Sequence, residues 1–79
     1  MSPDRGEVWK RLGPPTDQVG SVNDPRTHED HGVKWNEKWV YLAEDGRSVA
    51  RVVFWNRYDL VGVFAIAPDG SATPESLSG

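Results

Sequence analysis

Four adjacent residues near the middle of the chain carry side chains that metal ions prefer. They are His28, Glu29, Asp30 and His31, and the chain has no other histidine. Two histidines three positions apart converge if the segment forms one helical turn, and imidazole with carboxylate suits zinc or a similar divalent ion. A structural zinc site usually takes ligands from two separated pairs, and no second pair lies nearby. His28 and His31 are therefore candidate metal ligands. The alternative is that they belong to a solvated polar loop. We predict no cofactor.

Residue patterns for catalysis are weaker. Ser48 could act as a nucleophile only beside a base, and nothing in the sequence brings a histidine to it. Gly13-Pro14-Pro15 cannot offer the row of backbone N–H donors that a phosphate loop needs. A small sheet also leaves little room for a deep pocket. We therefore expect a protein that is not an enzyme.

Aromatic residues are abundant for 79 residues, with four tryptophans, two tyrosines and two phenylalanines. Exposed tryptophan, tyrosine and arginine side chains often form the strongest contacts with a partner. On this interpretation the candidate partner-binding residues are Arg51, Trp55, Arg57, Tyr58 and Trp35. The alternative is that the aromatic side chains form the core of a small domain, with Arg51 lying over Trp39 or Phe64 as a cation–π contact. We favour the core interpretation.

The charge pattern bears on nucleic-acid binding. The whole chain has a formal net charge of −3, whereas residues 33–67 carry a net charge of +1. Proteins that bind nucleic acids usually show a clear basic excess, because phosphate contacts supply much of the affinity. A nucleic-acid-binding module is thus possible but disfavoured, and it would use basic residues on or beside the sheet: Lys34, Lys38, Arg47, Arg51 and Arg57.

The N-terminal segment, residues 2–13, is predicted to be a helix. Ser2 can cap it, Pro3 suits the first helical position, and Gly13 followed by two prolines suits its end. Val8, Trp9 and Leu12 form one apolar stripe. A strand over residues 7–12 is the competing interpretation.

The rest of the chain predicts a loop, a sheet and a tail. Residues 14–32 are rich in Pro, Gly, Asn and Asp, and we expect them to be a long connector. Residues 33–67 contain three β-rich runs, at 35–43, 47–56 and 59–67, separated by turn residues. Residues 71–79 have the composition of a flexible tail. The predicted fold is a single α+β domain over residues 1–70: a short N-terminal helix, a long loop and a three-stranded antiparallel β-meander.

The register of the second hairpin is predicted from its turn. Arg57-Tyr58 at the tip pairs Trp55 with Leu60 and Val53 with Gly62. In the first hairpin, a two-residue and a three-residue turn differ by one residue, and that slip exchanges the faces of Trp39 and Val40. In either case both faces of the sheet are apolar.

This two-sided apolar sheet carries the functional prediction. One short helix can cover only one face, and an exposed apolar face indicates a partner. We therefore predict a non-enzymatic protein-interaction module that forms a homodimer through an apolar sheet face. The alternative is that the connector and the tail cover the second face, with Val19, Val22 and Leu77.

Composition also bears on the compartment. The chain has no cysteine, no N-terminal apolar run typical of a signal peptide and no apolar stretch of membrane-spanning length. The sequence therefore predicts a cytoplasmic protein without a membrane partner.

Overall fold

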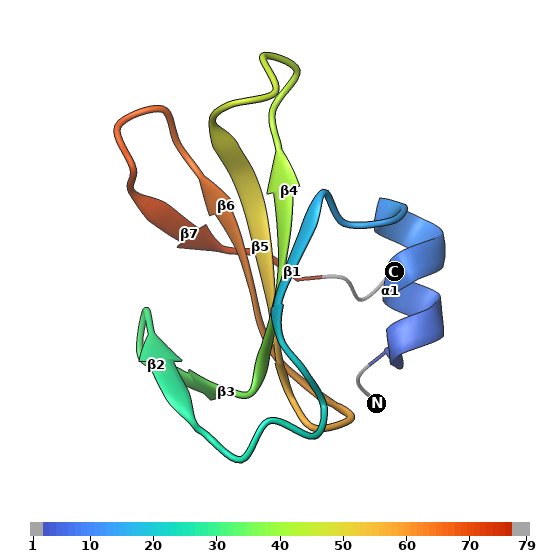
Figure 1. Ribbon diagram of the computed structural model, residues 1–79. Helices are drawn as coiled ribbons and strands as arrows, with labels where there is room; N and C mark the ends of the chain where they lie inside the picture. The colour runs from blue at the N-terminus through green and yellow to red at the C-terminus, as the bar shows by residue number, and fades with distance from the viewer. Residues whose placement is uncertain (1–2, 77–79) are drawn as a thin grey trace.

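The computed structural model describes residues 3–76, which form one short helix and seven strands. Five strands make the main antiparallel sheet, in the order β1-β4-β5-β6-β7, and β2 and β3 form a separate hairpin. The helix α1 lies against one face of the sheet, and the hairpin lies against one end of the opposite face (Figure 1). We call these the helix-side face and the hairpin-side face. The elements are α1 (Arg5–Leu12), β1 (Asp17–Gly20), β2 (His28–Asp30), β3 (Val33–Trp35), β4 (Glu37–Leu42), β5 (Val49–Asn56), β6 (Asp59–Ile66) and β7 (Ala72–Pro74).

The helix is confirmed, and the competing strand is not formed. It begins later than predicted, because Asp4 rather than Ser2 is the N-cap and its Oδ1 accepts a hydrogen bond from the Glu7 backbone N–H. An aspartate cap also places a negative charge at the positive end of the helix dipole. Gly13 ends the helix with a positive φ of 80°, which glycine adopts at little cost because it has no Cβ.

The sequence predicted that residues 14–32 form one long loop. This prediction is wrong, because the segment contains the strands β1 and β2. Strand β1 pairs with β4 along its whole length, from Asp17 opposite Val40 to Gly20 opposite Glu37. All four residues of β1 are exposed, and Val19 is its one apolar residue. Such an edge strand is held by backbone pairing rather than by burial, so it leaves no hydrophobic periodicity in the sequence.

The β2–β3 hairpin uses residues that the sequence assigned to the loop and to the start of the meander. His28 pairs with Trp35, and Asp30 pairs with Val33 across a tight turn. Both turn residues, His31 and Gly32, have a positive φ. The hairpin therefore turns the chain back before the main sheet resumes at β4.

The three predicted strands are present as β4, β5 and β6, but they are not a separate three-stranded meander, because β1 and β7 extend them to a five-stranded sheet. The first turn between them is also longer than expected. Residues 43–48 form this turn, in which Ala43 N–H donates to the Ser48 carbonyl (2.7 Å). Just before this turn, the pairing of β4 with β5 shifts its register between Tyr41 and Leu42, so that Leu42 lies opposite Val49. Neither the two-residue nor the three-residue turn is correct. Trp39 and Tyr41 lie on the helix-side face, and Val40 lies on the hairpin-side face.

The second hairpin confirms part of its predicted register. Trp55 lies opposite Leu60, with Arg57 and Tyr58 at the tip. A register shift between Phe54 and Trp55 then places Val53 opposite Val63, not Gly62. Val63 consequently joins Val53 on the helix-side face, and the predicted register is wrong by one residue beyond the shift.

The tail is not wholly flexible, because β7 pairs with the end of β6 from Phe64 to Ile66. The Glu75 backbone N–H donates to the Val63 carbonyl, and its side chain binds Arg51. Residues 77–79, which include Leu77, lie outside the described part of the chain.

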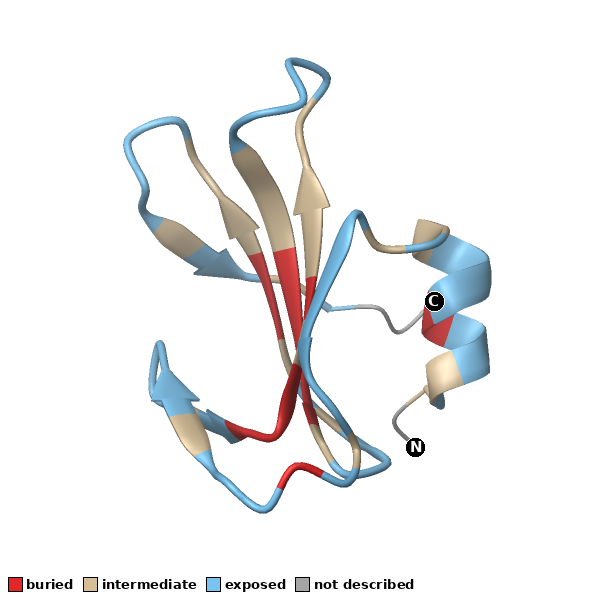
Figure 2. Ribbon diagram, in the orientation of Figure 1, coloured by how far each residue is buried: buried red, intermediate tan, exposed pale blue. Residues whose placement is uncertain are grey.

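Burial is concentrated at one end of the sheet. The buried segments lie where α1 and the β2–β3 hairpin flank the central strands, and the opposite ends of β4, β5 and β6 are only partly covered (Figure 2). Within residues 3–76, no helix has the length and apolar character needed to cross a membrane. The uneven covering of the sheet is the feature on which the candidate site depends.

Candidate functional site

The hairpin-side face is half covered by the chain itself. Its buried side chains are Trp35, Val52, Phe54 and Phe64. The β2–β3 hairpin supplies this cover through Trp35 and Val33, and the His31 ring lies 5.2 Å from that of Phe64. The β2–β3 hairpin thus covers part of the face that the sequence predicted to need a partner, and the remaining apolar side chains on this face are partly exposed.

The remainder of this face carries a group of aliphatic side chains, which we call the open stripe. It consists of one residue from each of four neighbouring strands, all packed against the buried cluster yet partly exposed: Val40, Val49, Ile66 and Ala72. Val52, which is buried, lies opposite Val40 on β5. The stripe therefore extends the apolar core to the surface without a break.

A hollow of about 250 Å³ adjoins the open stripe between the β4–β5 and β6–β7 turns. Val49 and Ile66 belong to both the hollow and the stripe, and the other lining residues are Ala43, Asp45, Ser48, Ala50 and Pro68. The polar lining groups are engaged locally, since Asp45 Oδ2 accepts a hydrogen bond from Ser48 Oγ (2.7 Å). The backbone N–H of Arg47 is the chief cause that lowers the pKa of Asp45. The hollow consequently presents mainly apolar surface.

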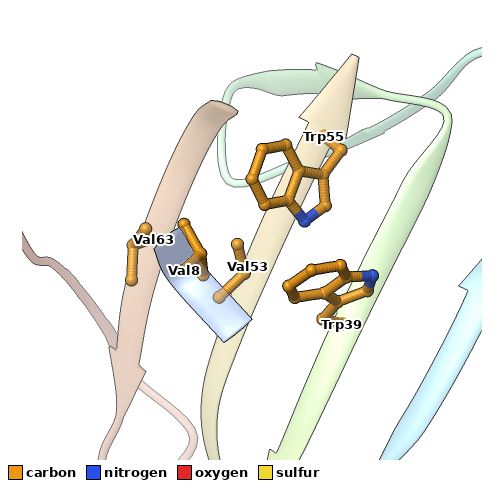
Figure 3. Packing of buried hydrophobic residues seen from close by; sticks show 5 residues of the cluster. All are labelled: Val8, Trp39, Val53, Trp55 and Val63. Atoms are coloured by element: carbon orange, nitrogen blue, oxygen red, sulfur yellow. The ribbon is translucent and has the colours of Figure 1, made fainter. Parts of the chain in front are cut away.

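The helix-side face is covered by α1. Four sheet side chains receive the helix, and we call them the helix cradle: Trp39, Val53, Trp55 and Val63 (Figure 3). Val8 of α1 is fully buried among them, and Leu12 packs at their edge. Trp9 meets the Trp39 ring edge-on at 5.7 Å between centroids and remains 44% exposed.

One buried polar atom in the cradle has no hydrogen-bond acceptor within the described chain, the Nε1 of Trp55. Its ring is tilted by 57° against that of Trp39, with centroids 5.0 Å apart, and its nitrogen edge is turned toward Trp39 (Figure 3). An N–H group directed at an aromatic face forms a weak hydrogen bond.

A partly buried ion pair ties α1 to the cradle. Glu37, which is 5% exposed, accepts from Arg5 Nη2 at 2.7 Å and from Trp39 Nε1 at 2.6 Å. The Arg5 guanidinium lies 5.2 Å from the ring centroids of both Trp39 and Trp55. Both Glu37 oxygens are therefore satisfied, and the group stabilises the docked helix rather than facing a substrate.

The two histidines lie at opposite ends of the β2 segment and pack on aromatic rings. His28 stacks on Trp35 at 4.5 Å, and its Nε2 lies 3.8 Å from the Asp24 carboxylate. That carboxylate accepts from the Arg26 backbone and side chain, which are the main causes lowering the pKa of Asp24. Within residues 3–76, no three His, Cys, Asp or Glu side chains gather so that they could hold a metal ion. Metal binding by His28 and His31 stays a prediction, and the structure offers it no third ligand.

Of the five predicted partner-binding residues, Trp35 and Trp55 cannot reach a partner, because they are 3% and 0% exposed. These two tryptophans follow the core interpretation. Arg51 does not lie over an aromatic ring as expected, since its guanidinium binds both oxygens of Glu75 (2.7 and 3.2 Å). Tyr58, at 72% exposed, remains available.

Arg57 lies beside Tyr58 at the tip of the β5–β6 hairpin. Its Nη1 donates to the Val22 carbonyl, and its own carbonyl accepts from Arg5 Nη1. Arg57 and Tyr58 thus occupy the end of the sheet opposite to the hollow, and the predicted partner-binding residues do not form one surface.

The basic residues of the strand region are also dispersed. Arg47 and Arg57 lie at opposite ends of β5, and Arg51 is paired with Glu75. Lys38 directs its Nζ over the Trp35 ring at 5.3 Å. No continuous basic track joins them, so nucleic-acid binding stays a prediction that no feature of the described surface favours.

Neither the open stripe nor the hollow could be assigned from the sequence. Val40, Val49 and Ile66 stand in strands where almost every residue is apolar, so the pattern does not show which of them the hairpin covers. Comparisons of the chain with protein-family models, with curated proteins and with solved structures found no match.

Proposed function

We propose that this protein is a non-enzymatic interaction module that self-associates through the open stripe and the adjoining hollow. The observation that supports the proposal is the group of partly exposed aliphatic side chains across β4, β5, β6 and β7. Contiguous apolar surface rimmed by polar residues is typical of protein contact sites. A second copy of the chain is the proposed partner, because an isologous contact buries the same apolar surface on both molecules.

The size of the surface indicates how tight such a contact is. A stable interface buries about 800 Å² on each partner, roughly one sixth of the 5151 Å² that the described chain exposes. The open stripe occupies half of one face of a small sheet. We therefore expect weak, transient association, with a Kd on the order of 10 µM to 1 mM.

Sedimentation equilibrium of the wild-type protein and two charged variants tests the proposal. Ile66→Lys places a charge in the stripe, and Ala72→Lys does so on the short edge strand, where folding tolerates change better. The matched control is Gln18→Lys, which adds the same charge on the exposed strand β1. Gln18 is paired with Trp39 and therefore lies on the helix-side face, away from the stripe.

We expect concentration-dependent association of the wild type and the control, and at least about tenfold weaker association of both stripe variants. A wild-type protein that stays monomeric at about 1 mM would contradict the proposal. Equal weakening by all three lysine variants would place the contact elsewhere.

A further inference from the structure

The helix α1 is held on the sheet mainly by side-chain contacts of one short segment, not by backbone pairing. Arg5 binds Glu37, Val8 enters the helix cradle, and Trp9 meets Trp39. At the other end of the helix, Tyr41 Oη donates to the Gly13 carbonyl at 3.0 Å. By contrast, backbone ladders join the five strands of the sheet to one another. The helix can consequently leave the sheet without breaking a strand pairing.

An undocked α1 does not persist as a helix. Isolated helices shorter than about 12 residues are marginal in water, and α1 has eight residues. A segment that leaves the cradle therefore loses its helical structure, and it regains that structure by docking. The cradle recognises a simple pattern, a cation followed by apolar residues three, four and seven positions later: Arg5, Val8, Trp9 and Leu12.

A short, proline-containing connection follows the helix. Gly13, Pro14 and Pro15 separate α1 from Thr16, whose N–H donates to the Val40 carbonyl at 2.8 Å. Two consecutive prolines favour an extended, stiff connection of about 3 Å per residue. The cradle has no means of distinguishing the chain's own helix from that of another copy, since the contacts of Arg5, Val8, Trp9 and Gly13 are made with the sheet and its β5–β6 turn.

From these observations we infer that the helix cradle is an exchange site, which accepts α1 from a second copy of this chain. In dilute solution the closed form predominates, because docking of the tethered helix within its own chain needs no second molecule. Reciprocal exchange then becomes measurable in concentrated protein. This contact uses the helix-side face and is independent of the open stripe on the other face.

Charge reversal of the Arg5–Glu37 pair tests the inference. Arg5→Glu and Glu37→Arg, made in separate chains, each place like charges between the helix and its own cradle. In a mixture, only exchange between the two chains restores opposite charges at both cradles. The control is the double variant R5E/E37R in one chain, in which the reversed pair reforms within the molecule.

We expect each single variant to be a monomer with a lowered Tm. Its tryptophan emission should be shifted to longer wavelength, as is typical of tryptophan exposed to water. Their equimolar mixture should form a one-to-one heterodimer with fluorescence close to that of the double variant, detected by native mass spectrometry. A mixture that stays monomeric while the double variant folds would overturn the inference.

If a single variant does not fold, the wild-type helix provides a second measurement. The chain has no cysteine, so Lys10→Cys accepts a single spin label on the exposed side of α1. Labelled chains are mixed at about 1 mM with ¹⁵N-labelled wild type. Intermolecular broadening of the Trp39, Val53 and Val63 amides is expected, and its absence would overturn the inference. Broadening confined to the open stripe would support the proposed association alone.

Discussion

Arg51 and Glu75 show how one pair of side chains anchors the C-terminal segment on the centre of the sheet. The guanidinium of Arg51 on β5 binds both carboxylate oxygens of Glu75, 24 positions along the chain. The hydrogen bonds from Arg51 lower the pKa of Glu75 below its ordinary value of 4.5. A carboxylate with a lowered pKa stabilises the folded state when it is ionised. The pair therefore links the order of the segment after β7 to pH.

This linkage predicts the pH dependence of Glu75→Gln. Above pH 4.5 the ionised Glu75 contributes stability, and the contribution is lost as the pH falls through its lowered folded-state pKa. The variant should thus be less stable than the wild type at neutral pH, and the difference should shrink toward about pH 3. Urea unfolding of both proteins across this pH range measures the difference between their unfolding free energies. The contributions of the other carboxylates are common to both proteins and cancel in this difference. A difference that does not change with pH would contradict the assignment.

Gly20 is fixed both by its conformation and by its surroundings. It has a φ of 76°, and a Cβ added there would overlap the carbonyl oxygen of Asn36. Asn36 is itself buried and donates its side-chain amide to the carbonyls of Asp24 and Arg26, so its backbone has little freedom to move. The approach of β1 to the start of β4 therefore requires glycine.

A pair of alanine substitutions separates these two requirements. Gly32 has nearly the same φ, 77°, but its Cβ would meet nothing within 4 Å. Gly32→Ala should cost about 1 kcal/mol of unfolding free energy for conformation alone. Gly20→Ala should cost at least about 2 kcal/mol more, because the Asn36 backbone must shift. Equal losses in chemical denaturation would show that the overlap is relieved without cost.

At the scale of elements, the sequence predicted what periodicity and turn chemistry determine. The helix between Asp4 and Gly13 and the three central strands follow from caps, β-branched runs and turn residues. The short strands β1, β2 and β7 were missed, since each is three or four residues long and mostly exposed. Such strands form because a neighbouring strand offers unpaired backbone groups, and this information lies in the tertiary structure.

The same limit applies to the candidate site. The sequence correctly indicated apolar side chains on both faces, but the bulge at Val61 reversed the faces of Val63 and Phe64. Which half of the hairpin-side face is covered depends on where the β2–β3 hairpin folds back. A hairpin of two three-residue strands leaves too weak a pattern to predict that position.

Val8 provides the test of helix docking at this scale. It is fully buried in the helix cradle, so Val8→Ala removes two methyl groups from a packed site. The loss of unfolding free energy should be about 2 kcal/mol. The control is Lys10→Ala on the exposed side of the same helix, for which a change within about 0.5 kcal/mol is expected. Similar values for the two variants would show that α1 contributes little to stability.

At the scale of the whole molecule, the two ends of the main sheet are covered unequally by the rest of the chain. One end of the sheet is enclosed by α1 and the β2–β3 hairpin, whereas the other end carries the open stripe (Figure 2). A chain of this size has little apolar surface to spare, because small domains bury a smaller fraction of their surface than large ones do. The proposed association would bury further apolar surface at this partly exposed half-face.

The most direct test of this account is a dilution series followed by ¹H–¹⁵N chemical shifts of the wild-type protein, from about 1 mM to 10 µM. We predict that concentration-dependent shifts gather on the open stripe and the turns beside the hollow, and that the amides of β2 and of exposed β1 stay unchanged. Shifts that are independent of concentration throughout residues 3–76, or that avoid the stripe, would contradict the claim that this half-face is an association surface.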